Sequence, residues 1–85
     1  MGYKLSIEKP ALKTLKKIPK PYKQKIIETI NMLKDNPKPL GAKKLVGRDG
    51  WRIRINDYRI IYITKESIST ILVISIGHRK NIYRH

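Results

Sequence analysis

The sequence contains no cysteine and no phenylalanine, and only six of its 85 residues are acidic. Without cysteine the chain can form neither a disulfide nor a thiolate metal site, so nothing indicates an oxidising compartment. Long apolar runs are also missing, because the longest, 60–63 and 71–74, have four residues each. A membrane-spanning helix needs about 20 apolar residues, and no apolar run at the N-terminus has the form of a secretory signal. We therefore expect a soluble cytoplasmic protein that does not enter a membrane.

Positive charge is what the sequence has in excess. Twenty Lys and Arg residues face six Asp and Glu residues, which gives a net charge of +14. Such a charge opposes compaction and favours a polyanionic partner. Nucleic acid is the first candidate, an acidic protein the second and an anionic membrane the third, beside a generically basic protein. A disordered basic arm is disfavoured because apolar residues recur with regular spacing throughout the chain.

Length and periodicity predict one domain spanning 1–85 with a modest core. The predicted order is β-α-α-β-β-β-β, an α+β fold with an N-terminal helical hairpin packed on one face of a mainly antiparallel sheet. Its last strand is nearly all apolar and is expected to be covered on both faces. The second helix is expected to bury a stripe formed by Tyr22, Ile26, Ile30 and Leu33. We expect strands at 3–8, 44–46, 51–55, 58–64 and 69–76, and helices at 10–18 and 21–34.

The clearest pattern is the strand–turn–strand stretch 51–64. Its first strand alternates apolar residues with Arg52 and Arg54, and its second strand carries Arg59. Asn56 and Asp57 between them suit a tight turn. If the apolar residues face the helices, both arginines of the first strand lie on the uncovered face.

Arginines on an open sheet face suit a phosphodiester ligand. A guanidinium group can donate two parallel hydrogen bonds to a phosphate, and it stays charged at any working pH. A tyrosine ring can stack on an unpaired RNA base. Arg79 follows the last strand and Tyr83 lies four residues further on. Six scattered carboxylates rarely converge on a metal, so we expect no cofactor. The predicted reaction is attack of the RNA's own 2′-hydroxyl on phosphorus, with cationic groups stabilising the developing charge.

The chain resembles a known family. Leu45-Val46-Gly47, the following WRIRINDYRIIY and the later VISIGHRKNIYR are similar to the RelE/ParE toxin superfamily, and most of all to its RelE-type messenger-RNA interferases. This resemblance implies a RelE-like fold and a ribosome-dependent endoribonuclease that cleaves messenger RNA. It also implies inhibition by a cognate acidic antitoxin, RelB-like or similar.

The resemblance also implies roles for five residues. Arg52 and Arg54 stand where RelE has two lysines that support charge stabilisation and proton transfer. Arg59 matches a phosphate-binding arginine. Arg79 matches an arginine that stabilises phosphate and protonates the leaving group, and Tyr83 matches a tyrosine that orients or stacks on the substrate.

The general base stays open at this point. A guanidinium at Arg54, with a pKa above about 12, rarely releases its proton. His78 and the terminal His85 have side chains that ordinarily titrate near neutrality, so His78 is the candidate general acid or base and His85 a weaker one.

Further RNA contacts are expected from the remaining basic residues. Val46 stands where RelE has a basic residue, so Lys44 or Arg48 is expected to supply that backbone contact. The basic C-terminal stretch adds Lys80 and Arg84 as RNA-binding candidates.

Other interpretations stand beside the nuclease. The chain could be a ParE-like toxin that inhibits DNA gyrase, or a non-enzymatic module that binds RNA or the ribosome. Arg52 and Arg54 could be a solvated strand face, and Arg59 could pair with Asp57 or Glu66. The remaining aromatic residues are expected to be structural: Tyr3, Tyr22, Trp51, Tyr58 and Tyr62.

Overall fold

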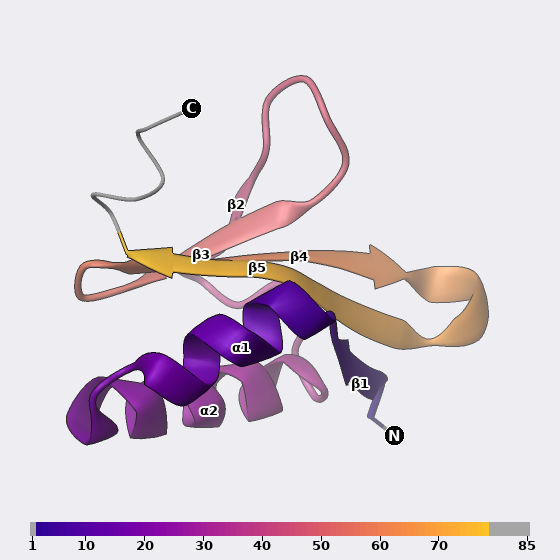
Figure 1. The fold of residues 1–85 in the computed structure, drawn as a ribbon. Coiled ribbons are helices and arrows are strands. Elements are labelled where there is room, and N and C mark those ends of the chain that lie inside the picture. The colour runs from indigo at the N-terminus through magenta and orange to yellow at the C-terminus, as the bar shows by residue number, and fades with distance from the viewer. Residues whose placement is uncertain (1, 79–85) are drawn as a thin grey trace.

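The computed structural model describes residues 2–78. Two α-helices pack on one face of a five-stranded sheet in the order β1-β5-β4-β3-β2 (Figure 1). All neighbouring strands are antiparallel except β1 and β5, which run parallel. The predicted α+β fold is therefore confirmed. The elements are β1 Lys4–Ile7, α1 Lys9–Lys17, α2 Lys20–Leu33, β2 Lys43–Lys44, β3 Trp51–Ile55, β4 Tyr58–Lys65, the 3₁₀ helix η1 Glu66–Ile68 and β5 Thr70–His78.

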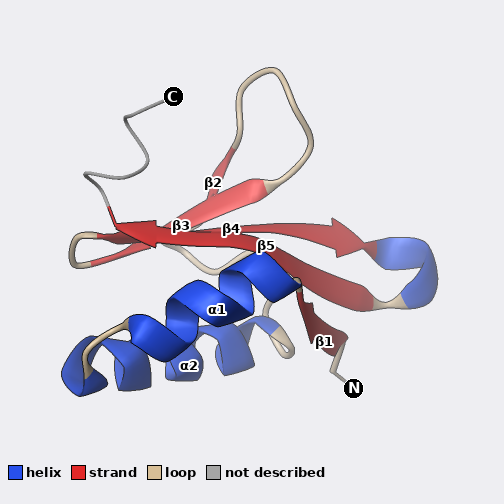
Figure 2. Cartoon of the chain, in the orientation of Figure 1, coloured by secondary structure: helices blue, strands red, loops and turns tan. Residues whose placement is uncertain are grey.

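Proline positions the helical hairpin. Pro10 and Pro21 lie in the first turns of α1 and α2, where their missing N–H groups cost no helical hydrogen bond. Lys16 and Lys17 lie in the last turn of α1, where positive charge is favourable. Pro19 precedes α2 with extended backbone and separates the two helices, which lie side by side beneath the sheet (Figure 2).

The core lies between the helices and the sheet. The helices contribute buried side chains at the predicted spacing, and alternate residues of β3, β4 and β5 meet them. Both helices lie on the same face of the sheet, so the described residues leave the opposite face without a helix; we call it the open face. The buried residues are Ala11, Leu15, Ile18, Ile26, Ile30, Leu33, Ile53, Ile60, Tyr62, Ile71, Val73 and Ile76.

A register shift interrupts β5. Ile61 pairs with Ser75 but Tyr62 pairs with Val73, so Ile74 is an extra residue opposite β4. The buried positions therefore change parity along the strand, with Val73 and Ile76 both in the core. The expectation that this strand is covered on both faces needs correction, because Ile74 and its neighbours on the open face are half-buried.

Several strand ends differ from the prediction by one or two residues, and the ends on either side of two loops show why. β2 ends at Lys44, and a hydrogen bond from the Leu45 N–H to the Gly50 carbonyl bridges the base of a loop in which Gly47 and Gly50 have positive φ. Val46 was predicted to lie in this strand, but it lies in the loop and is 98% exposed. Ser69 adopts a left-handed conformation with φ 46° after η1, so β5 begins one residue later than expected.

Candidate functional site

The open face of the β3–β4 hairpin carries three arginines. Arg52 and Arg54 alternate with buried Ile53, and Arg54 is directly opposite Arg59 in the register. Directly opposed side chains in a sheet have Cβ atoms about 4.5–5.5 Å apart. Arg52, Arg54 and Arg59, which we call the arginine face, therefore lie on one side of the sheet, as the alternation predicted.

The neighbouring strands leave room around these side chains. Arg59 is paired on its other side with Gly77, which has no side chain to cover it. Within residues 2–78, neither Arg52 nor Arg54 has a hydrogen bond or ion pair to another residue. The Nε atom of Arg59 is buried, whereas Arg54 is exposed. The guanidinium groups of Arg52 and Arg54 are thus available to an incoming anion.

A small hollow adjoins the arginine face. It has a volume of about 190 Å³ and is lined by Gly41, Lys43, Arg52 and Arg54. Pockets for drug-sized molecules usually measure about 300–1,000 Å³, so this hollow suits a group the size of one phosphate. The register places Lys43 directly beside Arg52 on the open face. Sequence reasoning missed Lys43, although its place in the alternation could have indicated it.

The other predicted RNA contacts fall in different places. Lys44 is paired with Trp51, so it lies on the side of β2 opposite to Lys43. Arg48 is exposed in the β2–β3 loop, which extends away from the helices in Figure 1. Four residues with predicted roles, Arg79, Lys80, Tyr83 and Arg84, lie outside the described residues, as does His85.

His78 is not brought to the arginine face. It is paired with Tyr58, and the two rings meet edge to face with centroids 5.1 Å apart. Tyr58 lies on the helix side of the sheet, where its ring is 5.8 Å from that of Tyr22 on α2. The candidate general acid or base therefore belongs to an aromatic group on the opposite face.

Two aromatic side chains of the β3–β4 hairpin contact the α2–β2 loop, and Tyr22 of α2 is more exposed than predicted. The Tyr62 hydroxyl donates a hydrogen bond to the Pro37 carbonyl at 2.8 Å, and burial raises the pKa of Tyr62 to about 12. Lys38 Nζ lies 5.4 Å from the Trp51 ring centre. Both contacts tie the α2–β2 loop to the sheet. Tyr22 differs from its prediction as a buried residue, because it is 41% exposed.

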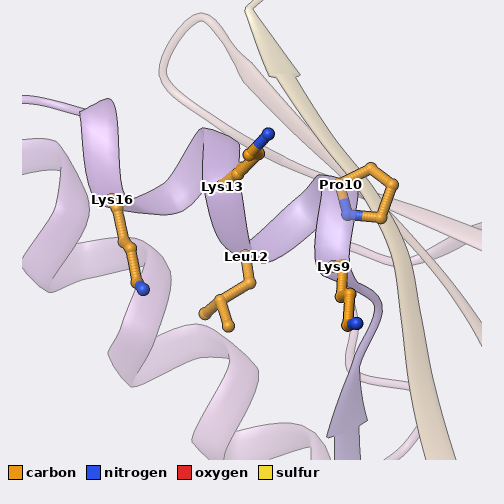
Figure 3. Close-up of a pocket in the computed structure, with 5 residues that line it drawn as sticks. All are labelled: Lys9, Pro10, Leu12, Lys13 and Lys16. Carbon is orange, nitrogen blue, oxygen red and sulfur yellow. The ribbon is translucent and has the colours of Figure 1, made fainter.

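The helical side of the molecule carries a second basic surface. A hollow of about 490 Å³ runs along α1, and we call it the lysine groove (Figure 3). Leu12, which is 38% exposed, lies between Lys9 and Lys16 along the helix. Pro10 and Leu12 form its apolar lining, and Lys9, Lys13 and Lys16 form its charged lining.

Two absences bear on what the described part of the chain can do. No group of three or more His, Cys, Asp or Glu residues within 2–78 is arranged to hold a metal ion. None of the helices in the same range is both long and apolar enough to cross a membrane.

Comparisons with known proteins agree on one family. Residues 5–83 match the model of a family described as the ParE toxin of the type II toxin–antitoxin system parDE. A protein of Methanocaldococcus jannaschii named RelE1 is 33% identical over 89 aligned residues, which cover 100% of this chain and 99% of the relative.

Solved structures share the whole fold. The archaeal RelE–RelB complex of Pyrococcus horikoshii matches with a TM-score of 0.80 and 26% identity, over 100% of each chain. The RelB–RelE antitoxin–toxin complex of Methanococcus jannaschii matches with a TM-score of 0.79 and 27% identity, over 94% of this chain and 96% of that one.

Proposed function

The chain belongs to the RelE/ParE superfamily of toxins from type II toxin–antitoxin systems, and we propose that it is a messenger-RNA endoribonuclease that acts on the ribosome without a metal ion. The proposal takes the arginine face as the site that binds the scissile phosphate. Arg52, Arg54 and Arg59 are its described members. Arg79 and Tyr83 are included for the roles that the family resemblance implies.

One observation carries this proposal: Arg54 and Arg59 are directly opposite each other across the β3–β4 ladder. Like charges in that position destabilise a sheet. Arg54 is exposed, so burial of its side chain contributes little stability in return. A bound phosphate reverses the sign of the interaction, because each guanidinium can then bind anionic oxygens. A phosphate bound next to this pair would therefore be contacted by two positive charges held on adjacent strands.

The chemistry follows from the substrate. The 2′-oxygen of the RNA attacks the adjacent phosphorus while its proton passes to a solvent water. The bond from phosphorus to the 5′-oxygen breaks, and the 5′-oxygen takes up a proton, the role that the family resemblance implies for Arg79. The products are a 2′,3′-cyclic phosphate and a 5′-hydroxyl. Guanidinium groups oriented in advance stabilise the charge that grows on the phosphoryl oxygens. DNA lacks the attacking hydroxyl and is not a substrate.

The basic residues divide this work. Arg54 keeps its proton because guanidinium pKa values exceed about 12, so its role is charge stabilisation and not proton abstraction. Lys43 extends the cationic row next to Arg52 and contacts a neighbouring phosphate. His78 faces the helix side, so in this proposal it does not take the proton from the 2′-hydroxyl.

The proposed partner in the cell is an acidic antitoxin. With a net charge of +14, the chain attracts an acidic protein over a long range. The structural relatives from Pyrococcus and Methanococcus were solved as complexes of RelE with RelB. The lysine groove suits the amphipathic segment of such a partner, since Leu12 offers an apolar contact and the lysines pair with carboxylates.

A second candidate is gyrase inhibition, which the ParE family match specifically favours. In that case the arginine face would bind a protein or DNA without cutting it. Purified gyrase would be blocked and messenger RNA would remain intact.

The test is a cleavage assay with a labelled message and purified ribosomes, with no metal ion beyond the magnesium that keeps the ribosomes assembled. We expect new 5′-hydroxyl ends with the wild-type chain and far fewer with Arg54→Ala. Lys13→Ala, which removes an exposed lysine on the other side of the molecule, is the matched control and should cut normally. An intact message together with inhibited gyrase supercoiling would replace this proposal with the ParE-like function.

A further inference from the structure

A second concave surface lies at the same end of the sheet as Arg54 and Arg59, but on the helix side. It has a volume of about 440 Å³ and we call it the aromatic hollow. Three elements build it: the N-terminal turn of α2, the β3–β4 turn and the end of β5. Its lining residues are Tyr22, Asn56, Asp57, Tyr58 and His78.

The exposure of Tyr22 is the feature that a purely structural role does not explain. The side chain occupies a position of the apolar stripe of α2, yet it is 41% exposed, while Ile26 one turn later is fully buried. Its ring is tilted by 45° against Tyr58, with centroids 5.8 Å apart. A second hollow of about 270 Å³ lies beside Tyr22 and Asn56. Tyr22 therefore presents aromatic surface to solvent in a concave setting.

The rest of the lining adds hydrogen-bonding groups. Asn56 and Asp57 are exposed at the tip of the hairpin, and Asn56 holds the left-handed conformation with φ 54° that asparagine tolerates. A carboxylate accepts two hydrogen bonds at once, and an amide both donates and accepts. An aromatic platform beside such groups has the chemistry that recognises a nucleobase with donors on its edge.

Size and position point to the same ligand. The aromatic hollow is more than twice as large as the hollow beside Arg52 and falls within the range of about 300–1,000 Å³ that holds a small molecule. In the register, the Ile55–Tyr58 pair directly follows the Arg54–Arg59 pair. One residue of a strand spans about 3.3 Å, so an RNA strand that passes over the hairpin tip can reach both faces.

We propose that the aromatic hollow binds one purine base, guanine in particular, of the RNA strand whose phosphate is held on the arginine face. The base stacks on Tyr22, and the two donors of its Watson–Crick edge bind the Asp57 carboxylate. Asn56 contacts the remaining polar edge. This inference rests on the proposed function and deepens it, because it gives the toxin a sequence preference next to the cleaved bond.

The direct test is an NMR titration of the full chain with guanosine 5′-monophosphate, with uridine 5′-monophosphate and inorganic phosphate as comparison ligands. We expect the guanine nucleotide to shift the amide signals of Tyr22, Asn56 and His78 in a saturable way. Inorganic phosphate should shift signals near Arg54 only. Uridine monophosphate should bind the hollow more weakly, because uracil is smaller and has one donor on its pairing edge.

Substitutions then assign the contact to the ring and the carboxylate. Tyr22→Leu keeps apolar contacts but should weaken guanine nucleotide binding about 5- to 150-fold, the range expected for loss of one stacked base. Tyr22→Phe should retain binding, and Asp57→Asn should reduce the preference for guanine over uracil. Tyr3→Leu removes a tyrosine at the opposite end of β5 and is the matched control.

The outcomes separate this inference from the proposed function. Normal message cleavage with no shifts in the hollow, or equal binding by Tyr22→Leu and wild type, overturns the base site and leaves the nuclease intact. Saturable guanine binding in the hollow without any message cleavage supports the base site and overturns the nuclease. A shift pattern identical for the guanine nucleotide and inorganic phosphate also overturns the base site.

Discussion

Two consecutive cross-strand pairs of the β3–β4 hairpin have opposite characters. Ile53 and Ile60 form a buried apolar pair beneath the helices, and the next pair, Arg54 and Arg59, joins two like charges on the open face. The first pair gains free energy from burial, whereas the second places two like charges opposite each other, an arrangement that does not favour the sheet. The comparison teaches that the residues that stabilise the fold and the residues proposed to bind phosphate alternate along the same strands, so each set can be changed separately.

The largest expected effect is a loss of stability caused by a substitution on the helix-facing side of the hairpin. Ile60→Ala should lower the free energy of unfolding by about 2–5 kcal/mol, because Ile60 is fully buried and the lost side chain leaves a cavity. Ile61→Ala is the matched control, since Ile61 is paired with Arg52 on the open face and is half-buried. Urea unfolding of the two variants checks the difference. Equal losses would show that the two faces are not distinct.

Next in size is the loss of activity from the open face. Arg54→Ala should reduce the rate of message cleavage about 10²- to 10³-fold, the loss expected when one preorganised charge-stabilising group is removed. Its free energy of unfolding should stay the same or rise slightly, because a like-charge pair is relieved. Single-turnover cleavage and thermal unfolding, measured on the same preparation, check both statements. A stability loss as large as that of Ile60→Ala would show that Arg54 is also needed for folding, so that the two faces do not have separate roles.

Ionisation of the buried Tyr62 side chain should make the stability of the fold depend on pH. Burial raises its pKa from the ordinary 10.0 to about 12, so the neutral phenol is favoured in the folded state. The corresponding stability is fully present below pH 10 and is lost as the pH rises toward 12, by up to about 3 kcal/mol. Tyr62→Phe should remove this loss, and it should cost about 1 kcal/mol near neutral pH through the missing bond to Pro37. Parallel slopes for both proteins between pH 10 and 12 would refute this origin of the pH dependence.

The smallest expected effect distinguishes two adjacent lysines. Lys43 lies beside Arg52 on the open face, and Lys44 is paired with Trp51 on the other side. Lys43→Ala should reduce the slope of log affinity for single-stranded RNA against log salt by about 0.7, the value for one lost phosphate contact. Lys44→Ala should leave the slope near that of the wild type. The reverse result would exchange the assignments of the two lysines.

Much of this arrangement was predictable from periodicity. Alternation at 51–59 indicated which face the arginines occupy, and the spacing of Ile26, Ile30 and Leu33 indicated the face that α2 buries. These patterns are informative because polar and apolar residues alternate within them.

The sequence is uninformative where that contrast is absent. Residues 71–74 are all apolar, so nothing marks Ile74 as the extra residue that changes the parity of β5. The side on which His78 lies depends on this shift, and it was not predictable. Tyr22 continues the apolar stripe of α2, but the hairpin tip leaves it partly uncovered. The roles proposed for Arg79 and Tyr83 rest on the family resemblance alone.

The measurement that tests the central claim most directly is a double-mutant cycle of cleavage rates for Arg54→Ala, Arg59→Ala and the combined variant. If both guanidinium groups act on a single phosphate, either substitution disables the same interaction, and the combined loss should be much smaller than the product of the two single losses. Losses that multiply would show that the two arginines act independently. Unchanged rates in all three variants would contradict the account as a whole.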